Sequence, residues 1–198
     1  MSPKIVPIVE GQAEVGSVPV LLRRLLAELG AHEVQVARPL RVRRNQFVRE
    51  GEAERAIQLA VRSREGVGCI LVILDADDDC PASLGPELLA RCADATRRPV
   101  AVVIANRELE AWFLGAKESL RGVRGIQEDA TAPPDPEAIR GAKERLSHNM
   151  RGRRYLEVDD QPALAAEMSL EAVESTCPSF AKLRRDVAGL VQRLALNP

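Results

Sequence analysis

The sequence predicts an α/β fold with a mainly parallel central sheet, helices on both faces of the sheet, and a helical C-terminal extension. Two short, continuous apolar runs, 69–74 (CILVIL) and 99–105 (PVAVVIA), are typical of strands buried on both faces. Segments with helical apolar spacing lie between the predicted strands. Alternation of strand and helix is the pattern of β-α-β units, which form parallel sheets.

The N-terminal third supplies two more predicted strands. Residues 4–9 (KIVPIV) form the first, and a glycine turn leads from it into a helix with an apolar stripe over 18–29. Residues 32–42 alternate weakly and include Pro39, which favours a strand near the sheet edge, followed by an arginine-rich loop. Residues 52–65 are predicted to form the helix that precedes the strand at 69–74.

The strand at 69–74 is followed by a predicted helix over 86–95, with Pro86 in its first turn. The strand at 99–105 ends in a segment, 106–110 (NRELE), that is expected to start a helix carrying Trp112.

The remaining sequence predicts a loop over 122–137, a basic helical segment over 140–154, and a helical tail. Three helices are expected in that tail, at 161–168, 169–175 and 179–196. The seam of the last one spans only about two heptads, which favours docking onto the domain; oligomerisation through it is the alternative. The chain is thus divided into an α/β core (1–121), a loop and basic segment (122–154), and a helical extension packed on the core (155–198).

Composition restricts the function classes. The 198-residue chain has a net charge of −1 and no apolar run near the roughly 20 residues that span a bilayer. Its N-terminus lacks the apolar core of a signal peptide. The four cysteines show no C-x-x-C pair and no histidine at zinc spacing, which favours a reducing compartment and argues against a zinc site. We therefore predict a cytoplasmic protein that does not contact membranes.

Acidic residues follow three predicted strands. Asp75 and Asp77 come directly after 69–74, where extended chain would point both to one side. Glu10 and Glu108 follow the first strand and the strand at 99–105, and the carboxyl ends of parallel strands meet at one edge of a sheet. Carboxylates so grouped repel one another unless a hard cation such as Mg²⁺ lies between them. The alternative is a solvated acidic loop that caps the next helix.

Other acids in these turns have two explanations each. Glu14 lies four residues after Glu10 and can reach the same site if the turn is helical. Glu14, Glu108 and Glu110 are equally explained as acids favoured at helix N-termini. Asp78 and Asp79 are expected to face solvent or cap a helix, although one of them could replace Asp77 as a ligand.

Arginine dominates the cations, and its planar fork suits phosphate. The candidate residues for contact with nucleic acid or another phosphate-bearing substrate come from two clusters: Arg41, Arg43, Arg44, Arg153 and Arg154. Arginines used simply as solvated cations are the alternative.

Two motifs carry a resemblance to a known superfamily. Residues 9–14 (VEGQAE), followed by 74–77 (LDAD) after a buried strand, resemble the Toprim (topoisomerase–primase) domain, and VEGQAE is also similar to Toprim nucleases of the overcoming-lysogenization-defect type. Residues 106–114 (NRELEAWFL) are similar to a motif of small, uncharacterised bacterial Toprim-like proteins of unknown function. The tail of that family resembles Tyr155, Asp160, Gln161, Met168, Ser179 and Phe180.

The resemblance implies a Toprim-like α/β fold with one or two Mg²⁺ or Mn²⁺ ions. By position, Asp75 and Asp77 would hold metal, Glu10 would hold metal or act as general acid and base, and Glu14 would be the second acid. Toprim activity is phosphodiester cleavage or transfer on nucleic acid, which implies a metal-dependent nuclease, in bacterial defence beside a partner ATPase or in genome maintenance. The alternatives are a non-catalytic module that binds nucleotide or nucleic acid, and a small-molecule phosphotransferase.

The sequence also departs from the resemblance. Tyr155, its only tyrosine, lies in the predicted helical tail and is not expected to act as a topoisomerase nucleophile. Ala13 stands where these motifs often carry threonine. The sequence has no P-loop, so energy coupling would require another chain.

Overall fold

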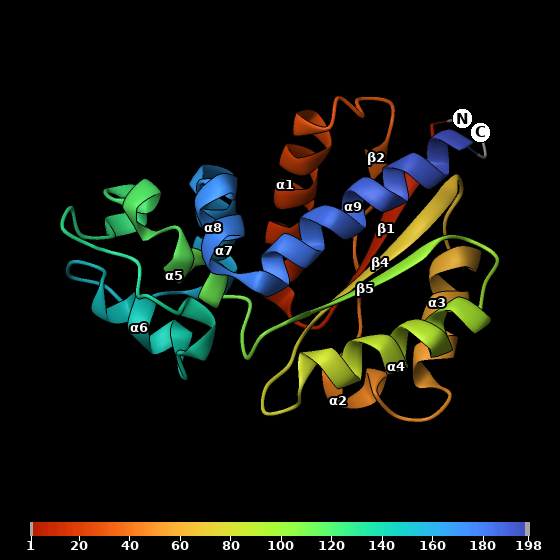
Figure 1. Cartoon of the computed structure of the whole chain (residues 1–198), viewed down its shortest axis with the longest axis horizontal. Coiled ribbons are helices and arrows are strands. Elements are labelled where there is room, and N and C mark those ends of the chain that lie inside the picture. Colours follow the sequence, from red (N-terminus) through yellow and green to blue (C-terminus); the bar gives the residue numbers. More distant parts are fainter. Residues whose placement is uncertain (1, 197–198) are drawn as a thin grey trace.

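The computed structural model describes residues 2–196 and has a parallel sheet at its centre, with the strand order β2-β1-β4-β5 (Figure 1). A further strand, β3, pairs with β1 beyond the end of β2. All pairings between these strands are parallel, which confirms the predicted sheet. The strands are β1 (Lys4–Val9), β2 (Gln35–Val36), β3 (Leu40–Arg41), β4 (Val67–Asp75) and β5 (Val100–Ala105).

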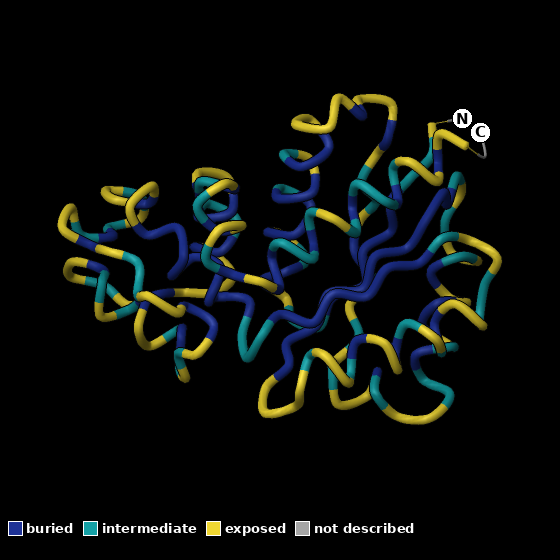
Figure 2. The backbone as a smooth tube through the Cα atoms, viewed as in Figure 1, coloured by how far each residue is buried: buried dark blue, intermediate teal, exposed yellow. Residues whose placement is uncertain are grey.

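Helices cover both faces of the sheet because the side chains of its central strands alternate between two apolar cores. On one face, Ile70, Val72 and Leu74 pack toward α2 (Arg44–Phe47), α3 (Glu52–Arg62) and α4 (Pro81–Asp94). On the other face, Leu71 and Ile73 belong to the core under α1 (Gln12–Glu28) and α9 (Pro178–Leu196). Figure 2 shows the strands as a continuously buried layer between the more exposed helices.

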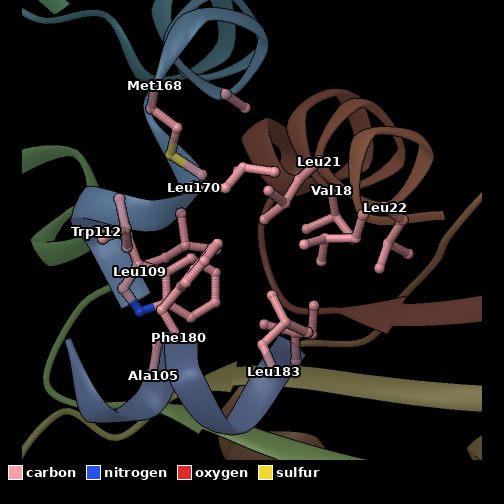
Figure 3. Packing of buried hydrophobic residues seen from close by; sticks show 14 of the residues in the cluster. Val18, Leu21, Leu22, Ala105, Leu109, Trp112, Met168, Leu170, Phe180 and Leu183 are labelled. Carbon is pink, nitrogen blue, oxygen red and sulfur yellow. The ribbon is translucent and has the colours of Figure 1, made fainter. Parts of the chain in front are cut away.

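The C-terminal helix α9 packs along the sheet, as the sequence predicts. Its seam residues Phe180, Leu183 and Val187 are fully buried, and α9 contacts β5 and β4. Figure 3 shows Phe180 beside Trp112, with their ring centroids 5.3 Å apart at 76°, an edge-to-face pair. The seam is thus used inside the molecule, and an oligomer built through this helix stays a prediction.

Shorter helices extend the molecule beyond the carboxyl ends of the strands (Figure 1). These are α5 (Ala111–Gly115), α6 (Ala142–His148), α7 (Glu157–Glu167) and α8 (Leu170–Thr176), with 3-10 turns η1 (Lys117–Leu120), η2 (Val123–Gly125) and η3 (Pro136–Ala138). Helix α7 lies against α1, the most extensive contact between two elements. One hydrophobic core joins the sheet to these helices, and the three-part division of the chain stays a prediction. Met1 and residues 197–198, the ends of that division, lie outside the described residues.

Several element boundaries differ from the prediction. The strand expected over 32–42 is two strands of two residues each, because the chain bends between them near Pro39. Helix α4 begins at Pro81, which takes the favoured first-turn position, so Pro86 lies inside the helix. Helix α7 begins at Glu157, four residues early, because the Asp160 carboxylate accepts a hydrogen bond from the Leu156 N–H at its start (2.8 Å).

Within residues 2–196, no helix has the length and apolar character needed to cross a bilayer.

Candidate functional site

The carboxyl ends of β1 and β4 bring Glu10 and Asp75 together. The Asp75 N–H donates to Glu10 Oε2 at 3.4 Å, so the first acid after β1 sits beside the last residue of β4. Asp75 Oδ1 accepts a hydrogen bond from the Leu109 N–H at 2.8 Å, which holds the turn after β5 over the same point. The parallel sheet therefore gathers three strand ends at one edge, as the sequence predicts.

Two further acids join this pair. Burial raises the pKa of Asp75 well above its usual range, and the charges of Glu110, Glu10 and Glu14 raise it further. Burial also raises the pKa of Glu10, with smaller upward contributions from Glu14 and Asp77. We call Glu10, Glu14, Asp75 and Glu110 the buried acidic cluster; Glu10 is half-buried and the other three are at most 9% exposed.

Glu110 is the most deeply buried glutamate of this cluster. Burial raises its pKa to about 7, although the charge of Lys143 and hydrogen bonds oppose the rise. Its Oε1 accepts two hydrogen bonds of 3.1 Å, from the Tyr155 hydroxyl and from Gln161 Nε2. Gln161 Nε2 also donates to Glu14 Oε1 at 3.1 Å, so a side chain of α7 links Glu14 to Glu110.

Two carboxylate oxygens of the cluster have no hydrogen-bond partner among the described residues. They are Glu14 Oε2 and Glu110 Oε2, and both are buried. An unsatisfied buried carboxylate oxygen is costly, and such oxygens are the ligands that Mg²⁺ and Mn²⁺ prefer. The donor chemistry therefore suits these ions. However, no group of three or more His, Cys, Asp and Glu side chains within residues 2–196 is arranged to hold a metal, so binding would require these side chains to rotate.

Lys143, on α6, supplies positive charge to the cluster. Burial alone would lower the pKa of Lys143, but the charges of Glu110, Glu157 and Asp75 outweigh burial and raise it. Its Nζ lies 3.2 Å from Glu157 Oε1. The basic segment (140–154) thus places the ammonium group of Lys143 near the acids at the strand ends.

Asp77 lies at the rim of the site. Strand β4 ends at Asp75, and Asp77 has a φ of +52°, so the alternation of an extended chain does not continue to it. Its side chain is 64% exposed and lies 3.6 Å from Arg44. The expectation that Asp75 and Asp77 point to one side fails for this conformation, while a ligand role for Asp77 stays a prediction.

Glu108 also lies outside the buried acidic cluster. It lines a polar cavity of about 190 Å³ with Asp77, Asp78, Arg107, Arg140 and Gly141. One of its carboxylate oxygens is buried and unpartnered among the described residues. The acid of this turn that belongs to the cluster is Glu110. Its sequence neighbours Leu109, Ala111 and Trp112 are all buried. These apolar neighbours are the feature of the sequence that indicates the burial of Glu110.

Of the five candidate arginines, two are engaged within the protein. Arg44 donates to the carbonyl oxygens of Asp75 (2.8 Å) and Ala76 (3.1 Å) and pairs with Asp79. Arg153 pairs with the buried Asp160 at 2.8 Å. The remaining three are exposed: Arg41, Arg43 and Arg154. A nucleic-acid role for any of the five stays a prediction.

The fold is similar to solved structures of the C-terminal regions of two OLD proteins. The C-terminal region of the Burkholderia pseudomallei OLD protein superposes with a TM-score of 0.52 at 17% identity, covering 94% of this chain and 98% of that one. The C-terminal region of the Xanthomonas campestris pv. campestris OLD protein gives a TM-score of 0.49 at 17% identity, covering 97% and 96%. These identities support likeness of fold only.

Comparison of sequences identifies the family. No curated protein matches the chain. Residues 9–188 match the family model described as "Domain of unknown function (DUF4276)", which spans every residue of the buried acidic cluster. This chain is therefore a member of the DUF4276 family.

Proposed function

We propose that this protein is a metal-dependent phosphodiesterase of the Toprim type that cleaves nucleic acid with one or two Mg²⁺ or Mn²⁺ ions. The observation that carries the proposal is the buried acidic cluster, in which four carboxylates lie at the strand ends and two of their oxygens are unpartnered among the described residues. So many buried carboxylates are mutually repulsive, and a divalent cation is the partner that relieves the repulsion.

Each acid has a part in the proposed chemistry. Glu10 and Asp75 would hold metal together with the free oxygens of Glu14 and Glu110, and Asp77 and Glu108 would complete the set from the rim. A bound metal would polarise the phosphodiester and lower the pKa of a water nucleophile. Alternatively, if Glu10 does not hold the metal, its partial burial and raised pKa suit a general acid and base, with Glu14 as the second catalytic acid.

The residues around the acids keep them in place. Gln161 and the Tyr155 hydroxyl fix the carboxylates of Glu14 and Glu110, and Lys143 offsets their charge. The Tyr155 hydroxyl donates to Glu110 inside the protein, and burial raises its pKa, so Tyr155 acts as a support for the cluster and not as a nucleophile.

The sequence motifs and the fold both support this assignment. The VEGQAE and LDAD motifs resemble Toprim nucleases, and the fold resembles the C-terminal region of OLD proteins. Because the sequence has no P-loop, we propose that a partner ATPase supplies any energy coupling, in a cytoplasmic bacterial defence system.

A non-catalytic nucleotide- or nucleic-acid-binding module is the second candidate. It is favoured by the absence of a preassembled three-residue metal group within residues 2–196. A small-molecule phosphotransferase would use the same acids.

A cleavage assay separates the candidates. Purified protein is incubated with Mg²⁺ or Mn²⁺ and with plasmid, single-stranded DNA or RNA. Cleavage by the wild type is expected to fall about 100-fold or more in Asp75→Asn and to persist in the matched control Asp94→Asn, which removes an exposed aspartate of α4. Absence of cleavage on all substrates, or equal rates in the two variants, would refute the enzymatic proposal.

A further inference from the structure

A polar cavity beside the buried acidic cluster has two arginines in its wall. Its lining combines the loop after β4, the turn after β5 and the start of α6. The arginines come from separate segments, Arg107 from the turn after β5 and Arg140 from the basic segment before α6. Asp77 and Glu108, the two rim acids of the proposed metal site, also line the cavity.

Both arginines are directed at a single carboxylate oxygen. Asp78 Oδ1 lies 2.7 Å from the Arg140 guanidinium and 3.8 Å from that of Arg107. Two guanidinium groups that converge on one oxygen from different segments form the arrangement that recognises a phosphate oxygen. Asp78 is 77% exposed and Arg140 71% exposed, and an exposed ion pair contributes little stability, so a competing anion can displace Asp78.

The backbone at Arg107 is tied to the acidic cluster by hydrogen bonds. Its φ is +60°, and its carbonyl oxygen accepts a hydrogen bond from the Asp77 N–H at 3.0 Å, which joins the two loops. Its side chain is only 30% exposed. The backbone two residues later binds Asp75 through the Leu109 N–H, so the position of Arg107 is fixed relative to the acidic cluster.

The size of the cavity selects the ligand. A volume of about 190 Å³ is smaller than the roughly 300–1,000 Å³ of sites that enclose a drug-sized molecule. It has room for one phosphate group with its hydration water, while a nucleobase would remain outside. The volume therefore fits the phosphate group of a larger ligand and does not fit a nucleotide enclosed with its base.

We propose that this cavity is a subsite for one backbone phosphate of a nucleic-acid strand, next to the phosphate at the acidic cluster, and that Asp78 fills it as a displaceable counter-ion in the free protein. The subsite rests on the proposed function for the following reason. Three carboxylates and two guanidinium groups line the cavity, so its lining has an excess of negative charge unless a metal is bound. A metal held by Asp77 and Glu108 would offset that excess and leave the pair of arginines available to phosphate.

The test measures binding of a fluorescein-labelled single-stranded oligonucleotide by anisotropy, with Ca²⁺ present and the oligonucleotide checked for integrity on a gel. Arg140→Gln is expected to weaken binding and to reduce the slope of log K against log salt by about 0.7, the value of one lost single-strand phosphate contact. Arg98→Gln, an exposed arginine near the opposite ends of the strands, is the matched control and keeps the wild-type slope.

Asp78→Asn should change oligonucleotide affinity in the opposite direction from Arg140→Gln. Removing the counter-ion is expected to tighten binding roughly three- to fivefold, the equivalent of an exposed ion pair that no longer has to be broken. Asp79→Asn removes the same charge one residue away, but Asp79 pairs with Arg44, so it should tighten binding less. In the double variant Asp78→Asn/Arg140→Gln, the gain in oligonucleotide affinity should disappear, because Asp78 acts by pairing with Arg140.

The outcomes separate this proposal from the enzymatic one. If the oligonucleotide binds with this pattern but is not cleaved in Mg²⁺ or Mn²⁺, the subsite stands and the phosphodiesterase proposal fails. If cleavage occurs but Asp78→Asn and Asp79→Asn bind alike, or the gain survives in the double variant, the subsite is refuted. Failure of the wild type to bind any oligonucleotide also refutes it.

Discussion

Gln161 Nε2 lies 3.1 Å from Glu14 Oε1 and 3.1 Å from Glu110 Oε1, so one amide joins the acid of α1 to the acid that precedes α5. Gln161 is itself fixed by the Ser17 hydroxyl, which donates to its Oε1 at 2.5 Å. Residues 14 and 161 are 147 positions apart in the chain. The C-terminal extension therefore completes the candidate site and is not merely packed on it.

Replacing Gln161 should destabilise the metal-free protein. Gln161→Met keeps the side chain's length but removes the amide donor of Glu14 Oε1 and leaves Glu110 Oε1 with the Tyr155 hydroxyl alone, at a cost of about 1–3 kcal/mol. Urea unfolding in chelator measures this change. Gln192→Met, at an exposed position of α9, should change stability by no more than about 0.5 kcal/mol. Equal stability of the two variants would show that the amide bridge is unimportant.

The sequence predicts the strands well because burial on both faces leaves an unmistakable apolar run at 69–74. It also places Glu10 and Asp75 correctly, since parallel strands end at one edge. The apolar residues around Glu110 are a sequence signal of its burial, but they do not show that Glu110 joins the cluster and Glu108 remains at the rim, because that choice depends on how Leu109 bonds to Asp75. The role of Gln161 depends on the packing of α7 against α1, a contact between distant segments that local patterns do not encode.

The raised pKa of Glu110 should make the free energy of unfolding depend on pH. Its pKa is about 7 in the folded chain and 4.5 as its ordinary value, so the folded state binds more protons between these pH values. Stability of the metal-free protein should therefore fall as pH rises from about 4.5 to about 7, with a slope contribution of up to about 1.4 kcal/mol per pH unit. Asp75, whose pKa is also raised, acts in the same direction.

Denaturant unfolding at a series of pH values checks this slope. Glu110→Gln should flatten the curve over that interval, whereas Glu167→Gln, at an exposed position of α7, should leave it as in the wild type. A wild-type stability that increases over the interval would contradict the assignment.

Arg44 should affect metal affinity without contacting metal. Its guanidinium holds the carbonyl oxygens of Asp75 and Ala76 and thereby fixes the loop that carries Asp77. Arg44→Gln should weaken Mn²⁺ binding by about 10- to 100-fold, as expected for groups that orient metal ligands. Calorimetry measures the affinity, and Arg43→Gln, an exposed neighbour with the same charge change, is the control. Equal affinities in the two variants would exclude an orienting role.

Tyr155 should not form a covalent intermediate. Its hydroxyl donates to Glu110 in the interior, so Tyr155→Phe removes one hydrogen bond and about 1 kcal/mol of stability. Cleavage should persist within about tenfold of the wild-type rate. Denaturing electrophoresis of reactions with labelled DNA is the check, and a protein–DNA adduct that disappears in Tyr155→Phe would assign a topoisomerase-like mechanism instead.

Titration of the protein with Mn²⁺ by isothermal calorimetry tests the central claim most directly. The buried acidic cluster predicts saturable binding of one or two ions by the wild type, retention of binding in Asp94→Asn, and its loss in Asp75→Asn and in Glu110→Gln. Absence of binding by the wild type, or undiminished binding in both cluster variants, would contradict a metal site at these strand ends.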